Sequence, residues 1–189
     1  GRYGPDERLV SGAGMFYVID SRRRQGELRP EKVEMALTGT RHAVVRMTGP
    51  YLTPEGARNA AATVYLHFYA RLPWVRISHQ LIVTEDTNAL WFKEIGVRFA
   101  TVGGGRETGT FNDSRESLSR VQTVPLAPGA AATMVQDEFP HFGSMKSHFS
   151  LSLREGEATR EVSSGAACGN WADLSTERWG LAAEVPAFC

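Results

Sequence analysis

Two tyrosines, one histidine and two arginines are concentrated between residues 65 and 76. Four of these residues follow one another at steps of two: Tyr65, His67, Tyr69 and Arg71. On a β-strand this spacing places them on one face, about 6.6 Å apart at each step, and we expect Arg76 of the next segment beside Arg71. Aromatic rings cover the apolar face of a sugar, and arginine holds a carboxylate through two hydrogen bonds. The set therefore predicts a surface for uronate-containing glycans.

The same residues also have a purely structural interpretation. Tyrosine and arginine are favoured on sheet surfaces because they pack well there, and such a face lies against solvent, a second sheet or another chain. The sequence leaves both interpretations open.

An antiparallel hairpin is expected to position these side chains. Apolar residues alternate with polar or aromatic ones over Val64–Leu72 and again over Val75–Val83. Residues 72–74 are the expected turn, since the proline at their centre supplies no strand donor. His79 falls on the apolar side of the second strand, so we predict that it is a core residue and not a ligand.

Alternation and turn residues divide the rest of the chain into short strands. This pattern predicts an all-β fold, an antiparallel β-sandwich of the supersandwich-like kind. Residues 55–62 are expected to form a helical turn or a loop, and residues 21–25, with three consecutive arginines, a solvated hairpin tip. Further strands are predicted at 15–20, 33–37, 43–48 (ended by Gly49 and Pro50), 91–102, 118–124, 132–139, 148–153 and 179–185, with loops at 103–105, 125–129 and 165–169.

The composition is that of an ordinary globular protein. Apolar residues make up 42% and charged residues 22% of the 189 residues. Lys plus Arg and Asp plus Glu both number 21, so the net charge is zero. This balance argues against a nucleic-acid partner, because that affinity comes from neutralising many phosphates. The longest uncharged stretch, 121–136, contains two prolines and is unsuited to a spanning helix, so no membrane partner is expected.

Motifs for metal, nucleotide or serine chemistry are missing from the sequence. It contains no His-Glu-x-x-His, no Cys-x-x-Cys and no Gly-x-Ser-x-Gly, and the glycines at 103–105 are not followed by Gly-Lys-Ser/Thr. We therefore expect neither a cofactor nor a metal. The two cysteines, Cys168 and Cys189, form one disulfide or remain two thiols. Asn112 begins an Asn-Asp-Ser triplet, which matches the glycosylation pattern of secreted proteins.

Several segments occur in an order that is informative as a whole: Phe16–Asp20, Arg41–Gly49, Tyr65–Leu72, Val75–His79 and Phe92–Phe99, then Asn170–Leu174 and Arg178–Leu181. This order resembles the exo-acting rhamnogalacturonan lyase (PcRGLX/YetA-like) family. The resemblance implies that residues 1–40 are the end of an N-terminal β-barrel or the first strands, and that residues 41–189 are a central β-sandwich, truncated at its C-terminus. Family members have Gly-Pro where this chain has Thr40-Arg41, and they continue into a helical domain. We therefore expect a fragment of a larger multidomain protein, extracellular or secreted.

A lyase of this kind removes the proton beside a uronate carboxylate and expels the 4-linked sugar. The chemistry needs a group that holds the carboxylate, a base, and an acid for the leaving oxygen. The candidates are Arg71 or Arg76 for the carboxylate, His67 for the base, and Tyr65 or Tyr69 for the acid. The alternatives are a noncatalytic β-sandwich that binds a polysaccharide or oligosaccharide or supports adjacent domains of the parent chain, and a structural or interaction module. Whether this piece is an enzyme stays open; we expect it to be inactive without the parent.

Overall fold

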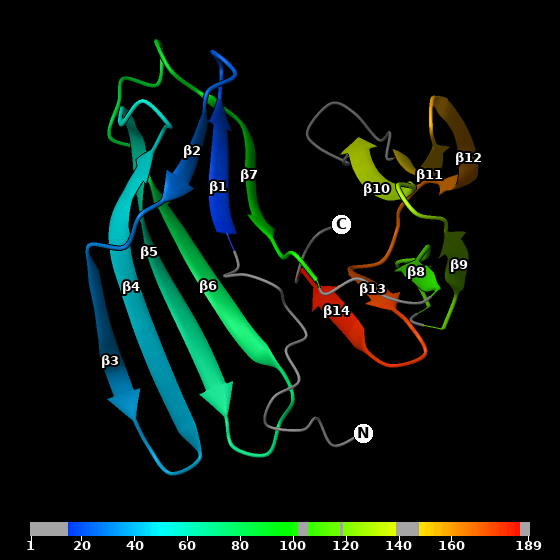
Figure 1. Cartoon of the computed structure of the whole chain (residues 1–189), viewed down its shortest axis with the longest axis horizontal. Coiled ribbons are helices and arrows are strands. Elements are labelled where there is room, and N and C mark those ends of the chain that lie inside the picture. The colour runs from blue at the N-terminus through cyan, green and yellow to red at the C-terminus, as the bar shows by residue number, and fades with distance from the viewer. Residues whose placement is uncertain (1–14, 102–105, 118, 139–147, 186–189) are drawn as a thin grey trace. The chain divides into compact units, whose positions relative to one another are not determined.

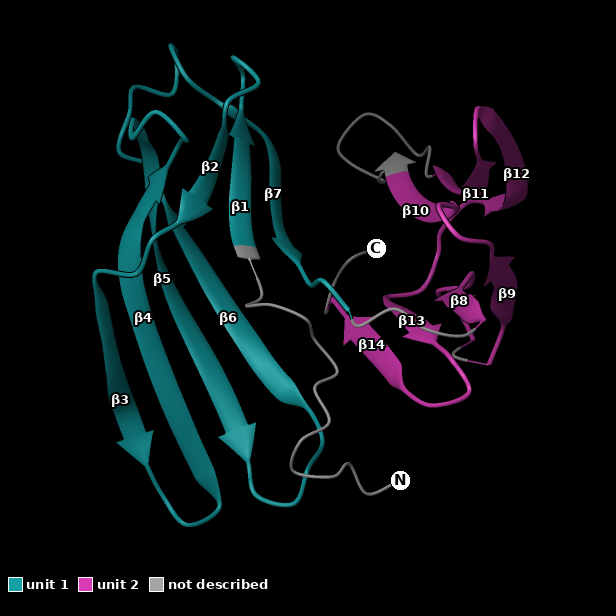
Figure 2. Cartoon of the chain, in the orientation of Figure 1, with its two compact units in different colours: residues 1–102 teal, residues 103–189 magenta. Residues whose placement is uncertain are grey.

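The computed structural model describes residues 15–101, 106–117, 119–138 and 148–185. Every regular element in these ranges is a β-strand and every strand pairing is antiparallel, which confirms the predicted all-β class. The chain divides into two compact units, unit 1 (Gly1–Val102) and unit 2 (Gly103–Cys189), as Figure 2 shows. The domain boundary expected between residues 40 and 41 falls inside the sheet of unit 1.

Unit 1 is built on one antiparallel sheet (Figure 1). Its seven strands are β1 (Met15–Asp20), β2 (Gln25–Leu28), β3 (Lys32–Thr38), β4 (His42–Leu52), β5 (Arg58–Tyr69), β6 (Val75–Ile82) and β7 (Phe92–Arg98). They lie in the order β6-β5-β4-β2-β1-β7, and β3 pairs with the part of β4 that β2 leaves uncovered. The predicted hairpin is confirmed, since β5 pairs with β6 in a register that sets His67 opposite Arg76.

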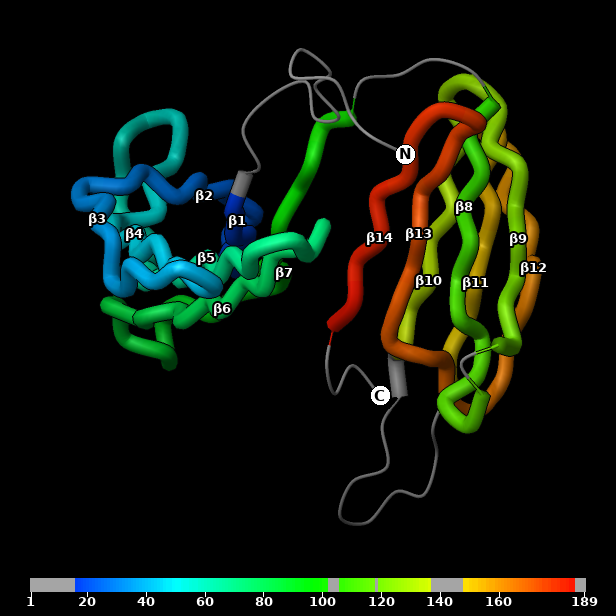
Figure 3. Tube along the Cα trace, turned by 90° about the horizontal axis from the view of Figure 1, so that it is seen from below, coloured from blue at the N-terminus to red at the C-terminus, as the bar shows by residue number. Residues whose placement is uncertain are grey.

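The core of unit 1 lies on one face of this sheet, which curls as seen along the strands in Figure 3. The curl brings β1 to β6, although three strands separate them in the sheet, and the ring of Phe16 stacks on His79 with 5.8 Å between centroids. His79 therefore faces the core, as predicted, and is partly buried there. The buried core residues are Phe16, Val18, Tyr51, Ala60, Ala62 and Val64.

Strand β4 does not end at Gly49 and Pro50, so that prediction is wrong. At this level the neighbour of β4 changes from β3 to β2, and the linker between those two strands crosses β4 directly. The backbone N–H of Arg29 in the linker donates to the carbonyl of Pro50 at 2.9 Å. A Cβ at Gly49 would collide with the carbonyl oxygen of Arg29. Glycine therefore allows the close approach, and proline is tolerated because it enters this contact as an acceptor.

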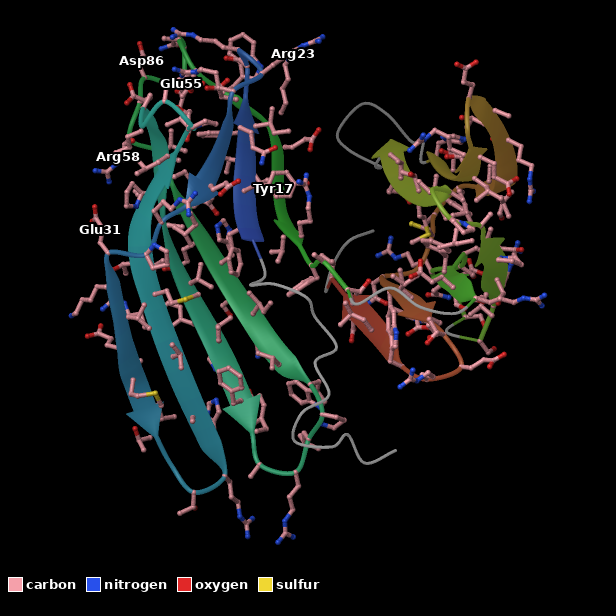
Figure 4. The ribbon with its side chains drawn as sticks, viewed as in Figure 1. Tyr17, Arg23, Glu31, Glu55, Arg58 and Asp86 are labelled. Carbon is pink, nitrogen blue, oxygen red and sulfur yellow. The ribbon has the colours of Figure 1, made fainter. Side chains whose placement is uncertain are left out.

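The consecutive arginines lie in the β1–β2 turn, as predicted, and Asp20 organises that turn. Its buried carboxylate accepts hydrogen bonds from the backbone amides of Arg22 and Arg24, both at 2.9 Å, and from Nε of Arg24 at 2.8 Å. Burial alone raises the pKa of Asp20, but the bonds from Arg24 and Arg22 outweigh it and hold the pKa below its usual value. Arg23 at the tip has a left-handed φ of 62° (Figure 4).

Of residues 55–62, expected to form a helical turn or a loop, only 55–57 lie in the turn before β5, and 58–62 belong to the strand. Strand β5 already begins at Arg58, and Ala60 and Ala62 belong to the buried core. Small side chains at these positions let β5 lie close to the other side of the curled sheet, so the alanines reflect packing space and not helix propensity.

Unit 2 contains two sheets that pack across one core (Figure 3). One sheet has the order β14-β13-β8-β9 and the other the order β10-β11-β12. Val124 of the first sheet packs with Leu151 and Leu153 of the second, so unit 2 has the layers of a β-sandwich. The strands are β8 (Glu107–Asn112), β9 (Val121–Leu126), β10 (Ala131–Glu138), β11 (His148–Glu155), β12 (Ala158–Gly165), β13 (Trp171–Ser175) and β14 (Gly180–Glu184).

Two features of unit 2 differ from the prediction by alternation. Strands β8, β12 and β13 were not expected, because their sequences are short and rich in polar residues. Pro125 was expected in a loop but lies in β9, an edge strand, where a missing N–H is tolerated. Gly129, with φ of 79°, forms the predicted turn after β9. The connection predicted at 103–105 lies outside the described residues.

Candidate functional site

The polar row predicted on β5 exists as far as Tyr69. Tyr65, His67 and Tyr69 share one face of the strand and are all half-buried. The ring centroids of Tyr65 and His67 are 6.5 Å apart, close to the spacing expected for alternate residues. This face is opposite to the one that carries the core residue Val64.

His42 joins the row from β4, and the sequence analysis missed it. It is the cross-strand partner of Tyr69, and the two rings stack almost parallel, at 2° and 4.5 Å between centroids. Its Nε2 lies 3.2 Å from Nδ1 of His67, a hydrogen bond in which one imidazole donates and the other accepts. We call these two side chains the His42–His67 pair. The pairing register of β4 and β5 alone brings them together, and this register cannot be read from the sequence.

Trp74 closes the stack at the end of the hairpin. Its ring lies 4.6 Å from the ring of Tyr69, tilted by 43°, and its side chain is 49% exposed. Tyr69 therefore contacts His42 face to face and Trp74 at a tilt. The indole of Trp74 is the exposed ring of the group, whereas Tyr69 and the two histidines are half-buried.

The two predicted arginines do not lie side by side. Arg76 is on β6 opposite His67, whereas β5 ends at Tyr69 and Arg71 lies in the turn with a left-handed φ of 66°. The expectation that Arg71 continues the row beside Arg76 is therefore wrong. The chain must reverse within a few residues, and the left-handed conformation at Arg71 is part of that reversal.

A third arginine comes from the neighbouring turn. The backbone N–H of Ala70 donates to the carbonyl of Arg41 at 2.9 Å, so the β3–β4 and β5–β6 turns meet at one end of the sheet, as Figure 1 also shows. We call residues 38–45 and 66–79 the basic end. These two segments contain no Asp or Glu. Within the described part of the chain, no carboxylate forms an ion pair with Arg41, Arg71 or Arg76, which are all exposed.

The rest of unit 1 balances its charges. Figure 4 labels Arg23, Glu55, Arg58 and Asp86 at the opposite end of the sheet, where both signs are mixed. Next to the polar row, Glu34 pairs with both of its cationic neighbours, at 2.6 Å from Lys32 and 3.0 Å from Arg46. The hydrogen bond from Lys32 is the main cause that lowers the pKa of Glu34. The basic end differs from these places because neither of its two segments contains a carboxylate.

A second titratable pair lies in the core of unit 1. The hydroxyl of Tyr51 and Nε2 of His79 are 2.7 Å apart. Burial raises the pKa of Tyr51 to about 12 and lowers the pKa of His79, so both side chains are neutral at physiological pH. Tyr51 is fully buried and belongs to the core cluster, which makes this pair a structural element.

Buried polar groups of unit 2 form a cluster around Asp113, in which Oδ1 of Asn112 has no hydrogen-bond partner among the described residues. The carboxylate of Asp113 accepts hydrogen bonds from Gln122 at 2.9 Å and Ser163 at 3.1 Å, and pairs with Arg120 at 3.2 Å. Asn112, which begins the glycosylation triplet, is fully buried and its amide nitrogen donates to the carbonyls of residues 117 and 120. These contacts hold the β8–β9 connection in place.

Within the described ranges, no cluster of three or more His, Cys, Asp or Glu side chains is arranged to hold a metal ion. In the same ranges, no helix has the length and apolar character needed to cross a membrane. Cys168 is buried, whereas Cys189 lies outside the described residues, so their pairing stays a prediction.

Three comparisons with known proteins complete this description. No family model, no curated protein and no solved structure matches this chain. The function must therefore be argued from the geometry of the basic end.

Proposed function

We propose that the basic end of unit 1 binds uronate-containing glycans. The observation that carries this proposal is the combination of three exposed arginines without a carboxylate and the half-exposed indole of Trp74. Exposed arginines on adjacent turns create a locally positive potential, which attracts a polyanionic ligand.

Each group has a distinct task in this proposal. The indole of Trp74 covers the apolar face of one sugar ring. Arg76, and Arg71 or Arg41 on the turns, bind uronate carboxylates through paired hydrogen bonds. The hydroxyl of Tyr69 and the edges of the His42–His67 pair meet sugar hydroxyls. Because the rings of Tyr69, His42 and Trp74 are stacked, they are already ordered before the ligand arrives, and less entropy is lost on binding.

The test is the affinity of the chain for trigalacturonate and rhamnogalacturonan oligosaccharides, measured by calorimetry at pH 7.5. We expect Trp74→Ala and Arg76→Gln each to weaken binding about tenfold, the equivalent of about 1.4 kcal/mol. Matched controls lie away from the basic end: Trp91, also exposed, for the indole, and Arg58 for the guanidinium. Trp91→Ala and Arg58→Gln should bind like the unaltered protein, and binding should weaken with salt. Equal affinity for a neutral glucan would contradict the proposal.

Lyase activity is a second candidate function, favoured by the His42–His67 pair. A base needs a partner that orients it, and Nδ1 of His67 is held by Nε2 of His42, which leaves Nε2 of His67 for a substrate proton. In this mechanism Arg76 holds the carboxylate, His67 takes the adjacent proton, and Tyr69 protonates the leaving oxygen as the double bond forms. The assay is the ultraviolet absorbance of the unsaturated uronate, with His67→Gln and Tyr69→Phe as test variants. Binding without any absorbance change would leave the noncatalytic glycan-binding function.

A further inference from the structure

We propose that the affinity of the basic end for uronate carboxylates rises on acidification, because the His42–His67 pair takes up one proton when the ligand binds. The inference rests on the proposed function and adds regulation to the same site. It starts from the 3.2 Å separation of the two ring nitrogens.

The space between the two nitrogens holds one hydrogen. In the neutral pair, one nitrogen carries it and the lone pair of the other accepts it. One further proton on the outer nitrogen of the donor ring leaves this hydrogen bond intact, strengthens it by charge, and gives the pair a charge of +1. A second added proton would set two N–H groups and two positive charges against each other. The pair is therefore suited to gaining a single charge.

The charged and titratable groups around the pair favour an anionic ligand. From β3, Lys32 and Glu34 share this face, and from β4 so does Arg46; Glu34 forms ion pairs with both cations, and the three groups together keep a charge of +1. From β5 the neighbours are Tyr65 and Tyr69, and from β6 the neighbour is Arg76. The adjoining turns add Arg41 and Arg71.

Within this set, Glu34 is the only carboxylate, and it is already engaged by two cations. A uronate carboxylate bound at Arg76 is therefore the anion with which a protonated pair can interact. The proton on the pair and the carboxylate stabilise each other, so each raises the affinity for the other by the same factor. If the bound ligand raises the proton affinity of the pair tenfold, the glycan binds tenfold more tightly once the pair is protonated.

The experiment is calorimetric titration of trigalacturonate from pH 8.0 to pH 5.0. Uronate carboxyl groups resemble ordinary carboxylic acids, with pKa values near 3.5, so the ligand stays ionised throughout. We expect the affinity of the unaltered protein to rise about tenfold between pH 7.5 and pH 5.5. His67→Gln and His42→Gln should lose the rise, each compared with its own affinity at pH 7.5, and His148→Gln in unit 2 should keep it. NMR titration of the imidazole rings should show proton uptake at higher pH when trigalacturonate is present.

The outcomes separate this inference from the proposed function. A flat pH profile in a protein whose binding still depends on Trp74 would overturn the inference and leave the glycan site in place. A rise that persists in both histidine variants would do the same. Absence of trigalacturonate binding at every pH would refute the proposed function, and the inference with it.

Discussion

Replacing Tyr51 by phenylalanine should lower the free energy of unfolding of unit 1 by about 1–2 kcal/mol, because it removes one hydrogen bond from the core. The hydroxyl lies 2.7 Å from Nε2 of His79. Burial raises the pKa of Tyr51 to about 12, so the hydroxyl keeps its proton and donates, and burial lowers the pKa of His79, so the neutral imidazole accepts. A buried acceptor that loses its donor costs about 1–3 kcal/mol, and His79 is only partly buried, which places the expected cost in the lower half of that range.

Urea unfolding combined with hydrogen exchange of peptides from β5 and β6 measures this change in unit 1 alone. With a denaturant slope of about 2 kcal/mol/M, a loss of about 1.5 kcal/mol lowers the midpoint by about 0.7 M. The matched control is Tyr65→Phe, which removes a hydroxyl from the opposite, half-exposed face of β5 and should leave the midpoint unchanged. Equal midpoints for Tyr51→Phe and Tyr65→Phe would refute the reasoning.

The same core pair sets a direction for the pH dependence of stability. The pKa of His79 is lower in the folded protein than in the unfolded chain, where it is about 6.5. The unfolded chain therefore binds a proton first as the pH falls, and unit 1 loses stability below about pH 6.5. Unfolding midpoints at pH 7.5 and pH 5.0 measure the loss, which should be smaller in a His79→Gln variant.

Three further predictions concern stability and modification. Asn59 is fully buried, and neither side-chain amide atom has a hydrogen-bond partner in the described structure. Asn59→Leu should therefore stabilise unit 1 by about 1 kcal/mol and raise its Tm by about 4 °C or more. A lower Tm would contradict this. Gly49→Ala should destabilise unit 1 by about 1–3 kcal/mol in urea, since the new Cβ meets the backbone oxygen of Arg29, and an unchanged midpoint would count against that contact. Asn112 should carry no glycan when the chain is secreted from a eukaryotic host, because its amide nitrogen is buried and bonded; a glycan mass on that peptide would show otherwise.

Much of the fold follows from local patterns, and the exceptions have identifiable causes. Period-two alternation located the β5–β6 hairpin and placed His79 on the core side. A sheet with one buried face has apolar residues at every second position of its strands, and this pattern is visible in the sequence. Alternation failed for β8 and β12, whose sequences are largely polar. Alternation also failed at Gly49 and Pro50. These two residues accommodate the linker between β2 and β3, which comes from another part of the chain and lies against β4.

The candidate site was predictable in part, for a related reason. The row of Tyr65, His67 and Tyr69 lies on one strand and needed only the strand period. His42 enters through the β4–β5 register, and register is a property of pairing that one strand does not reveal. Arg71 was misplaced because the strand ends two residues earlier, at Tyr69, and the left-handed conformation at an arginine has no sequence signal comparable to glycine.

Some arginines of unit 1 have a carboxylate partner, and those of the basic end have none in the described part of the chain. This difference favours ligand binding over folding as the explanation for the arginines of the basic end. Two arginines that support the fold are accompanied by a carboxylate: Arg24 pairs with Asp20, and Arg46 pairs with Glu34. The ring stack of Tyr69, His42 and Trp74 already orders the turns at the basic end, so structure alone does not require cations there. Moreover, the indole of Trp74 is half-exposed beside exposed arginines, which suits a ligand with apolar sugar faces and carboxylates. If packing were the whole explanation, replacing Arg76 by glutamine would relieve repulsion between like charges, and the variant would be at least as stable while glycan affinity stayed the same.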